Sequence, residues 1–559
     1  MSWGFEFKKT QGRRYLCLVE KKRTEKGPRN VRQIYVGTAE ALLQKLATPY
    51  TPLRSFEFGK MAALVHAATE TGLLEALRRH APRGLFDGYS VENLLFLQTA
   101  SRVDRPLSRE GMAEWLSHSA LPLVLPTVGR PSSRTLRRYL LRLYGAGEKE
   151  ERGEGLLSRA VTHRVEEQVF RTLLAKGIDP SWLLFDTTNF FAHHRQGHFP
   201  HRGRSKEKRR DKNLVGLGLV TMGNLPVLSE IYPGNEADPK VFSRVFTALV
   251  ERLLRLEVAT EKLVMVFDRG INSTGNFEKV TEAMHVIAAL NRQQARKLLS
   301  IPLEKFQEVA KDGDGEPVLG FPSRWQGFEQ DWRVLVTYRK ATADHQEKTW
   351  VERREKVLAH VEEWRKAPTE SEKALWRKLN AIIPETFQTA FEVKVMEVPV
   401  VRKGKPSKGY IPQVQVLAGA EARLRASFGK TAVITDLPEK ELSDERLVEG
   451  FVARSQLEDD FRWLKDRHVV SVKPFWVWHD AAVPGHVFLC VMGLLLLRYL
   501  QWELRDDPVT MKELVEGLER IKVVLVQTPE GKPRLVLEKM GREEARIFSR
   551  LNLHQYIPT

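Results

Sequence analysis

Two aspartates stand where their carboxylates could do chemistry together. Asp186 follows the apolar run 182–185, and Asp268 follows the apolar run 263–267. Each run predicts a short buried strand, and functional groups of an α/β sheet gather at the ends of its strands. A strand-terminal aspartate taken alone is more often a turn or cap residue, so the interpretation of this pair depends on a third acid.

The third acid is Glu458, within a helix predicted from about Ser443 to Lys465. At ~100° per residue, three side chains share its face, roughly +20°, −40° and −20° away: Phe451, Arg454 and Lys465. Asp459 and Asp460 point elsewhere, where we expect them to be solvated or paired. A carboxylate and two cations on one stripe also fit an ion-paired surface helix. The two strand aspartates favour a functional interpretation.

Three separated carboxylates suit hard divalent cations, which take oxygen ligands together with water and substrate phosphate. Two such ions can activate water and stabilise the leaving oxygen of an attack on a phosphodiester. We therefore expect Asp186, Asp268 and Glu458 to be catalytic metal ligands for Mg²⁺, with Mn²⁺ as an alternative. Arg454 and Lys465 would hold phosphates beside the metal.

The composition indicates a polyanionic partner. Among 559 residues, 89 Lys and Arg stand against 71 Asp and Glu, a net charge of +18. This excess points to nucleic acid.

The remaining composition indicates the class of protein. The 42% hydrophobic residues suffice for more than one core, and two cysteines exclude a disulfide scaffold. The longest apolar run, 487–497, is roughly half a membrane span, and the first residues do not resemble a signal peptide. We expect a soluble, intracellular, multidomain protein.

Periodicity predicts an α/β fold with a mixed sheet and flanking helices. The expected parts are an N-terminal β unit (1–50), a helical DNA-binding region (51–178), a catalytic core in two parts (179–299 and 441–505), a β-rich insertion (300–440) and a C-terminal region (506–559).

Two basic segments are candidate DNA contacts. A helix after Pro131, capped by Ser132 or Ser133, carries four arginines beside an apolar stripe: Arg134, Arg137, Arg138 and Arg142. The alternative for these arginines is a solvated charged face. The loop after Asp186 carries further cations, which include Arg202, Arg204, Lys206, Lys208, Arg209 and Arg210. Four histidines in this loop (His193, His194, His198 and His201) could indicate zinc, but no recognised ligand spacing supports it. Trp325 and Trp332 could stack on an extruded base, although core packing is the preferred interpretation.

These motifs together resemble a known family, the DDE transposases of bacterial insertion sequences, and in particular the Insertion Sequence 4 superfamily, Insertion Sequence 1634 type. The matching elements are Asp186-Thr187-Thr188, Gly234-Asn235-Glu236-Ala237-Asp238, Asp268-Arg269-Gly270, the helix residues Arg454, Glu458 and Lys465, and Gly485-His486 with Phe488 and Cys490. Phe451 replaces the tyrosine of the family's helix signature. The resemblance spans about 180–500. The long interval from Asp268 to Glu458 matches the β-rich insertion known in that superfamily.

The resemblance implies an RNase H-like catalytic core and an enzyme that cuts DNA at element ends and joins them to target DNA, an activity of DNA transposition and recombination. It implies double-stranded DNA partners (terminal inverted repeats and target), a homodimer or larger assembly on DNA, no membrane, and a cytoplasmic, nucleoid-associated location. It also suggests a DNA hairpin intermediate. Two alternatives remain: an RNase H-like nuclease without strand transfer, and a catalytically silent DNA-binding descendant of a transposase.

Overall fold

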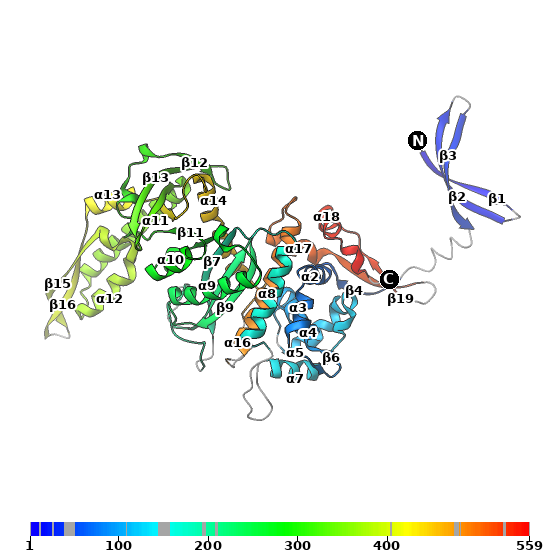
Figure 1. Cartoon of the computed structure of the whole chain (residues 1–559), viewed down its shortest axis with the longest axis horizontal. Helices are drawn as coiled ribbons and strands as arrows, with labels where there is room; N and C mark the ends of the chain where they lie inside the picture. Colours follow the sequence, from blue (N-terminus) through cyan, green and yellow to red (C-terminus); the bar gives the residue numbers. More distant parts are fainter. Residues whose placement is uncertain are drawn as a thin grey trace. The chain divides into compact units, whose positions relative to one another are not determined.

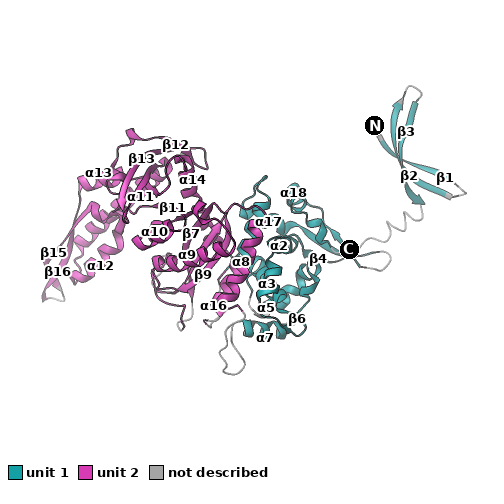
Figure 2. Cartoon of the chain, in the orientation of Figure 1, with its two compact units in different colours: residues 1–156, 467–471, 492–559 teal, residues 157–466, 472–491 magenta. Residues whose placement is uncertain are grey.

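The computed structural model describes residues 2–10, 13–24, 27–38, 51–107, 109–143, 157–192, 197–206, 211–402, 405–473, 480, 482–528 and 533–557. The chain divides into two compact units (Figure 2). Unit 1 comprises residues 1–156, 467–471 and 492–559, and unit 2 comprises residues 157–466 and 472–491. The boundaries drawn from the sequence do not coincide with this division, because strand pairing joins segments that are distant in the chain.

Unit 2 contains a nine-stranded mixed sheet in the order β12-β13-β14-β17-β11-β10-β7-β8-β9 (Figure 1). Its first strands in the chain are β7 (Trp182–Ala192), β8 (Asn213–Met222), β9 (Leu225–Pro233), β10 (Val264–Phe267) and β11 (His285–Ala289). Strands β7, β8 and β9 form an antiparallel meander. Strand β10 runs parallel to both β7 and β11. The predicted α/β fold with a mixed sheet is therefore confirmed.

Four strands of the same sheet come from the segment 300–440, which the sequence treated as a separate insertion. They are β12 (Gln307–Lys311), β13 (Pro317–Gly327), β14 (Gln330–Tyr338) and β17 (Lys430–Thr435). Strand β17 lies between β14 and β11 and pairs antiparallel with both. Its residues 432–434 are buried, so hydrophobic burial fixes it in the middle of the sheet.

Trp332, on β14, belongs to the core of this sheet. Its side chain is fully buried, and its Nε1 donates to the Gly327 carbonyl at 2.9 Å. Core packing is confirmed for this tryptophan.

Between β14 and β17 the chain makes an excursion with a core of its own. It consists of α11 (Lys340–Lys366), α12 (Glu372–Ile382), β15 (Phe391–Arg402), β16 (Lys405–Val416) and α13 (Ala418–Ala426). Trp350 is fully buried and packs against Phe387 and Phe391, with ring centroids 5.2 and 5.4 Å apart. The excursion begins and ends at neighbouring points of the sheet: Tyr338 pairs with Lys430 across β14 and β17.

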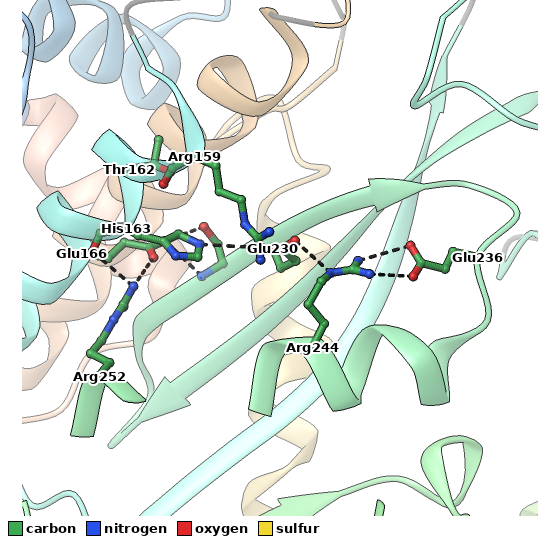
Figure 3. A network of polar contacts seen from close by, with 9 residues as sticks. Arg159, Thr162, His163, Glu166, Glu230, Glu236, Arg244 and Arg252 are labelled. Atoms are coloured by element: carbon green, nitrogen blue, oxygen red, sulfur yellow. Dashed lines mark hydrogen bonds and ion pairs between the residues drawn. The ribbon is translucent and has the colours of Figure 1, made fainter. Parts of the chain in front are cut away.

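Helices of unit 2 pack against the sheet, among them α8 (Arg159–Ala175), α9 (Asp238–Arg255), α10 (Thr274–Thr281), α14 (Asp444–Ala453) and α15 (Ser455–Trp463). Helix α9 buries Phe242 against Phe185 of β7, with ring centroids 5.1 Å apart. A buried ion pair, Glu166 with Arg252 at 3.1 Å, joins α8 to α9 (Figure 3). The amide of Ser229 on β9 donates to the same Glu166 carboxylate at 3.0 Å. These contacts fix helices α8 and α9 to β9, the edge strand of the meander.

Unit 1 joins N-terminal and C-terminal segments. It contains a sheet of β4 (Thr51–Glu57), β18 (Lys522–Gln527) and β19 (Pro533–Leu537), and helices that include α2 (Gly59–Glu70), α4 (Val91–Asp104), α7 (Ser133–Leu143), α17 (Met511–Arg520) and α18 (Arg542–Arg550). Helix α17 packs against both α2 and α18. The amide of Gly59 donates to the Ile521 carbonyl at 2.9 Å. A Cβ at Gly59 would lie 2.5 Å from the Leu518 carbonyl oxygen, so this close approach needs glycine. The predicted C-terminal region thus shares one core with the helices after residue 51.

The N-terminal residues form a separate three-stranded sheet of β1 (Ser2–Thr10), β2 (Arg13–Thr24) and β3 (Gly27–Thr38).

Helix α16 (Ala482–Glu503) is the most apolar of the described helices that are long enough to cross a membrane. Within its most apolar stretch, 89% of the residues are buried inside the protein. That degree of burial is typical of a core helix. His486 belongs to this core: it is 1% exposed, and its Nε2 bonds to the Val472 carbonyl at 2.9 Å.

Candidate active site

The parallel pairing of β7 and β10 places Asp186 next to Asp268. Phe185 pairs with Phe267, and the two aspartates are the next residues of their strands. The prediction that they lie on neighbouring strands is confirmed. The expectation that Asp186 ends its strand is wrong, because β7 continues to Ala192 by pairing with β8. Strand β10 ends at Phe267, so Asp268 stands where the parallel pairing stops.

Arg454 connects the second aspartate to the helix acid. Its Nη1 lies 3.7 Å from Oδ1 of Asp268 and 3.5 Å from Oε1 of Glu458. The guanidinium also lies 5.4 Å from the ring centroid of Phe451, a cation–π distance. The phenylalanine that replaces the family's tyrosine therefore helps to hold the arginine in place.

The helix that carries these residues differs from the predicted one. Instead of a single helix from Ser443 to Lys465, the structure has α14 and α15, which meet at Arg454. Ser443 caps α14 by accepting from the Arg446 amide. Lys465 lies beyond the end of α15, with its Nζ 5.8 Å from the ring centroid of Phe190 on β7.

The three adjacent acids of α15 have different surroundings. The Glu458 side chain is 61% exposed and faces Arg454. Asp459 pairs with Arg462 on the outer face, as expected. Asp460 is fully buried, so this side chain is not solvated, but it does have an interaction partner, as the alternative of a paired side chain expects. The reason for its burial is that α15 packs against β7, which places the Asp460 face of the helix inside the protein.

Lys206 is the direct cationic partner of Asp186. Its Nζ lies 3.4 Å from Oδ1 of Asp186 and 3.0 Å from the hydroxyl oxygen of Thr187. Burial raises the pKa of the Asp186 carboxyl above its ordinary value, although Lys206, the Thr187 amide and Arg454 act in the opposite direction. The sequence placed Lys206 among the loop cations and gave no sign that it would reach the first acid.

The loop around Lys206 is held by close backbone contacts. Asp480 accepts a hydrogen bond from the Phe199 amide at 3.2 Å and another from the His198 amide. A Cβ at Gly203 would lie 1.9 Å from the Gly234 carbonyl oxygen. Gly234 begins the Gly-Asn-x-x-Asp element. Because Gly203 has no Cβ, the loop backbone can lie directly against this element.

The other loop cations have varied positions. Arg202 and Arg204 are exposed. Lys208, Arg209 and Arg210 lie outside the described residues, as do His193 and His194. Among the described residues, no group of three or more histidines, cysteines or acids is arranged to hold a metal ion. The described part of the chain therefore contains no group of residues that fits zinc. The three predicted acids likewise do not surround a common metal position in it.

The acids nevertheless have the donor chemistry that a hard cation needs. Asp186 and Asp268 are close enough for the charge of Asp268 to raise the pKa of the Asp186 carboxyl, and Arg454 lies between the carboxylates of Asp268 and Glu458. Carboxylate oxygens are the protein ligands that Mg²⁺ prefers.

A further cation at the same sheet edge was missed by the sequence reasoning. Arg292 follows β11, the parallel neighbour of β10. Its Nη1 is buried and has no hydrogen-bond partner within the described part of the chain. Burial, and then the nearby charge of Arg269, lower the pKa of the Arg292 guanidinium. The available signal was an arginine three residues beyond the apolar run that forms β11, at the edge that also carries Asp268.

The arginines predicted to bind DNA lie in unit 1. Helix α7 begins at Ser133 and is capped by Ser132, which accepts from the Thr135 amide at 3.2 Å. All four of its arginines (Arg134, Arg137, Arg138 and Arg142) are exposed, and Leu136 and Leu143 are buried. Arg138 pairs with Asp87 at 2.7 Å.

No protein-family model matches this chain, and no curated protein matches its sequence. A solved structure described as a cryo-EM structure of a piggyBac transposase synaptic complex with hairpin DNA is similar over 84% of this chain and 82% of that chain, with 7% sequence identity and a TM-score of 0.33. A TM-score this low carries no conclusion about the activity of the present chain.

Proposed function

We propose that the chain is a metal-dependent DNA transposase of the DDE type, with Asp186, Asp268 and Glu458 as the acids that hold Mg²⁺. The observation that carries the proposal is the β7–β10 register, which brings the two aspartates side by side. Arg454 then links Asp268 to a glutamate 190 residues further along the chain. Convergence of these distant residues fits the order of motifs in insertion-sequence transposases.

The fold supports the finer proposal of an RNase H-like core. Three antiparallel strands followed by a parallel pair, with helices packed on the sheet, agree with the mixed sheet expected of that core. Strands β12 to β14 and β17 would then be an elaboration of the core sheet, and the excursion between β14 and β17 would be the β-rich insertion.

The chain's own residues would position DNA at this edge. Bound Mg²⁺ supplies activation of a hydrolytic water or 3′-hydroxyl and stabilisation of the leaving oxygen. Lys206 and Arg454 already neutralise the acids, and each can turn to a phosphate oxygen when a cation takes over that neutralisation. Lys465 lies beside β7 and can hold the flanking backbone.

Recognition of element ends belongs, in this proposal, to helix α7, with Arg134, Arg137 and Arg142 facing DNA and Arg138 held by Asp87. The exposed Arg202 and Arg204 would contact phosphates without reading sequence. Two ends must be brought together for strand transfer, so the working form would be a homodimer or larger assembly on DNA.

The decisive experiment compares Asp186→Asn with Asp459→Asn on labelled DNA that carries the element's terminal repeat. Asp186→Asn should abolish cleavage in Mg²⁺ and leave DNA binding nearly intact, because only a metal ligand is lost. Asp459→Asn, with its side chain on the outer face of α15, should cleave normally. Full cleavage by Asp186→Asn would overturn the assignment. Joining assays on paired ends separate a transposase from a nuclease without strand transfer, and a silent descendant would show neither reaction.

A further inference from the structure

The N-terminal sheet has one face lined by aromatic side chains. Trp3, Phe5 and Phe7 alternate along β1 and therefore point to the same side. In the pairing register, Phe5 lies opposite Leu18, and Leu18 lies opposite Ile34. Directly paired residues share a face, so this aromatic face extends across all three strands.

The opposite face of the sheet carries its most buried side chains. Cys17 and Val19 are 1% and 0% exposed. The rings of Tyr15 and Tyr35 meet there with centroids 5.0 Å apart, and Gln33 donates to the Cys17 sulfur at 3.4 Å. Cys17 and Val19, the two most buried side chains among the described residues of this sheet, therefore both lie on the face opposite the aromatic rings of β1.

The aromatic face is open to solvent. Trp3, Phe5 and Phe7 are 48%, 69% and 64% exposed, and Ile34 is 43% exposed. At ~3.4 Å rise per residue, successive rings along β1 stand roughly 7 Å apart. Monomeric proteins rarely leave contiguous apolar surface uncovered unless it binds something.

The charge of this segment indicates what binds. Residues 1–38 contain ten Lys and Arg and three Asp and Glu. Lys9 on β1 and Arg14 on β2 lie opposite each other at one end of the aromatic face, and both side chains are exposed. A second copy of the same sheet would bring two strongly basic surfaces together, which like-charge repulsion opposes. A polyanion is attracted by the same charge.

We propose that the aromatic face of β1–β3 is a binding site for single-stranded nucleic acid, in which Trp3, Phe5 and Phe7 stack on successive unpaired bases. Stacking needs the flat face of a base, which a duplex keeps inside its own stack, so the site prefers single strands. Aromatic rings on a basic sheet provide this kind of binding without reading sequence. The site lies outside the unit that carries the three acids and needs no metal.

The test is fluorescence anisotropy of the full-length protein with a labelled oligothymidylate of about 16 nucleotides, the upper site size of one small β-domain. EDTA is present, so cleavage plays no part. Each of Trp3→Ala, Phe5→Ala and Phe7→Ala should weaken binding about fivefold or more, since stacking contributes at least ~1 kcal/mol per base. Phe5→Tyr should bind as the parent protein does, whereas Phe5→Leu, which is apolar without a ring, should behave like Phe5→Ala.

The matched control is Trp376→Ala, which removes a tryptophan that is 36% exposed on α12 and should leave binding unchanged. Equal affinity of the triple alanine variant and the parent would overturn the proposal, as would full binding by Phe5→Leu. Sedimentation equilibrium provides a further check: self-association that the triple variant loses would identify a second copy as the occupant and reject nucleic acid. Because these readouts require neither metal nor cleavage, they fail independently of the proposed transposase activity.

Discussion

The ion pair between Glu166 and Arg252 should be a major determinant of the stability of unit 2. Both side chains are 1% exposed. The carboxylate also accepts from the Ser229 hydroxyl at 2.5 Å. Arg252 donates to the His163 carbonyl at 3.2 Å (Figure 3). Glu166→Gln keeps the size of the side chain and removes its charge, which leaves a buried guanidinium without a counter-ion.

Removing one partner of a buried pair costs about 3–5 kcal/mol. The remaining carbonyl acceptors of Arg252 favour the lower end of that range, about 3 kcal/mol. A matched control lies one residue away on the same two helices: Glu167 pairs with Arg255 at 2.8 Å, but these side chains are 21% and 54% exposed. Exposed pairs contribute about 0–1 kcal/mol, so Glu167→Gln should change stability little.

Urea unfolding followed by circular dichroism measures the difference. With an m-value of about 3 kcal/mol/M, Glu166→Gln should lower the midpoint by about 1 M, and Glu167→Gln by about 0.3 M or less. Hydrogen exchange of α8 peptides assigns the loss to unit 2, since two units can unfold separately. Equal shifts for the two variants would refute the reasoning, because burial would then make no difference to the strength of the pair.

Three further predictions concern the site. Glu458→Gln should lower cleavage and strand transfer by orders of magnitude, whereas Asp459→Asn should keep most activity, and a cleavage assay that ranks them the other way would reject Glu458 as the third acid. Lys465→Ala should reduce the slope of log affinity against log salt by about one, as expected for the loss of the phosphate contact proposed for Lys465; an unchanged slope in anisotropy titrations would exclude that contact. Burial raises the pKa of the Asp186 carboxyl, so cleavage should fall as the pH drops towards that raised value and the metal ligand is protonated. Lys206→Met removes a cation that lowers this pKa, and the acid side of the pH–rate profile should move to higher pH; a shift to lower pH would contradict the electrostatics.

Strand and helix types were predictable where a local pattern was uninterrupted. The strand predicted at 263–267 corresponds to β10, and the helix predicted after Pro131 corresponds to α7. The adjacency of Asp186 and Asp268 was predictable as well, because each follows an apolar run typical of a buried strand in one α/β segment, although β7 continues past Asp186. These features depend on local patterns that the sequence displays directly.

Features that depend on pairing between distant segments were not predictable. Nothing local indicates that β17 would lie between β14 and β11, or that β18 would pair with β4. Helical-wheel geometry placed Arg454 beside Glu458, but it could not show that the Asp460 face would pack against β7. The partnership of Lys206 with Asp186 likewise depends on how a loop folds back.

The route of the chain between β14 and β17 has a consequence for how this protein can vary. The Arg339 amide donates to the Gly429 carbonyl at 3.0 Å, so the two strands are joined as a hairpin whose turn is an entire folded excursion. The register of a hairpin depends on the residues that pair, and closing a longer loop adds only about 0.6 kcal/mol per doubling of its length. Residues 340–428 could therefore grow, shrink or be exchanged over generations while the sheet kept its alignment. The number of residues between Asp268 and Glu458 is in this sense nearly neutral, and relatives with very different intervals could share the same three-dimensional arrangement of acids.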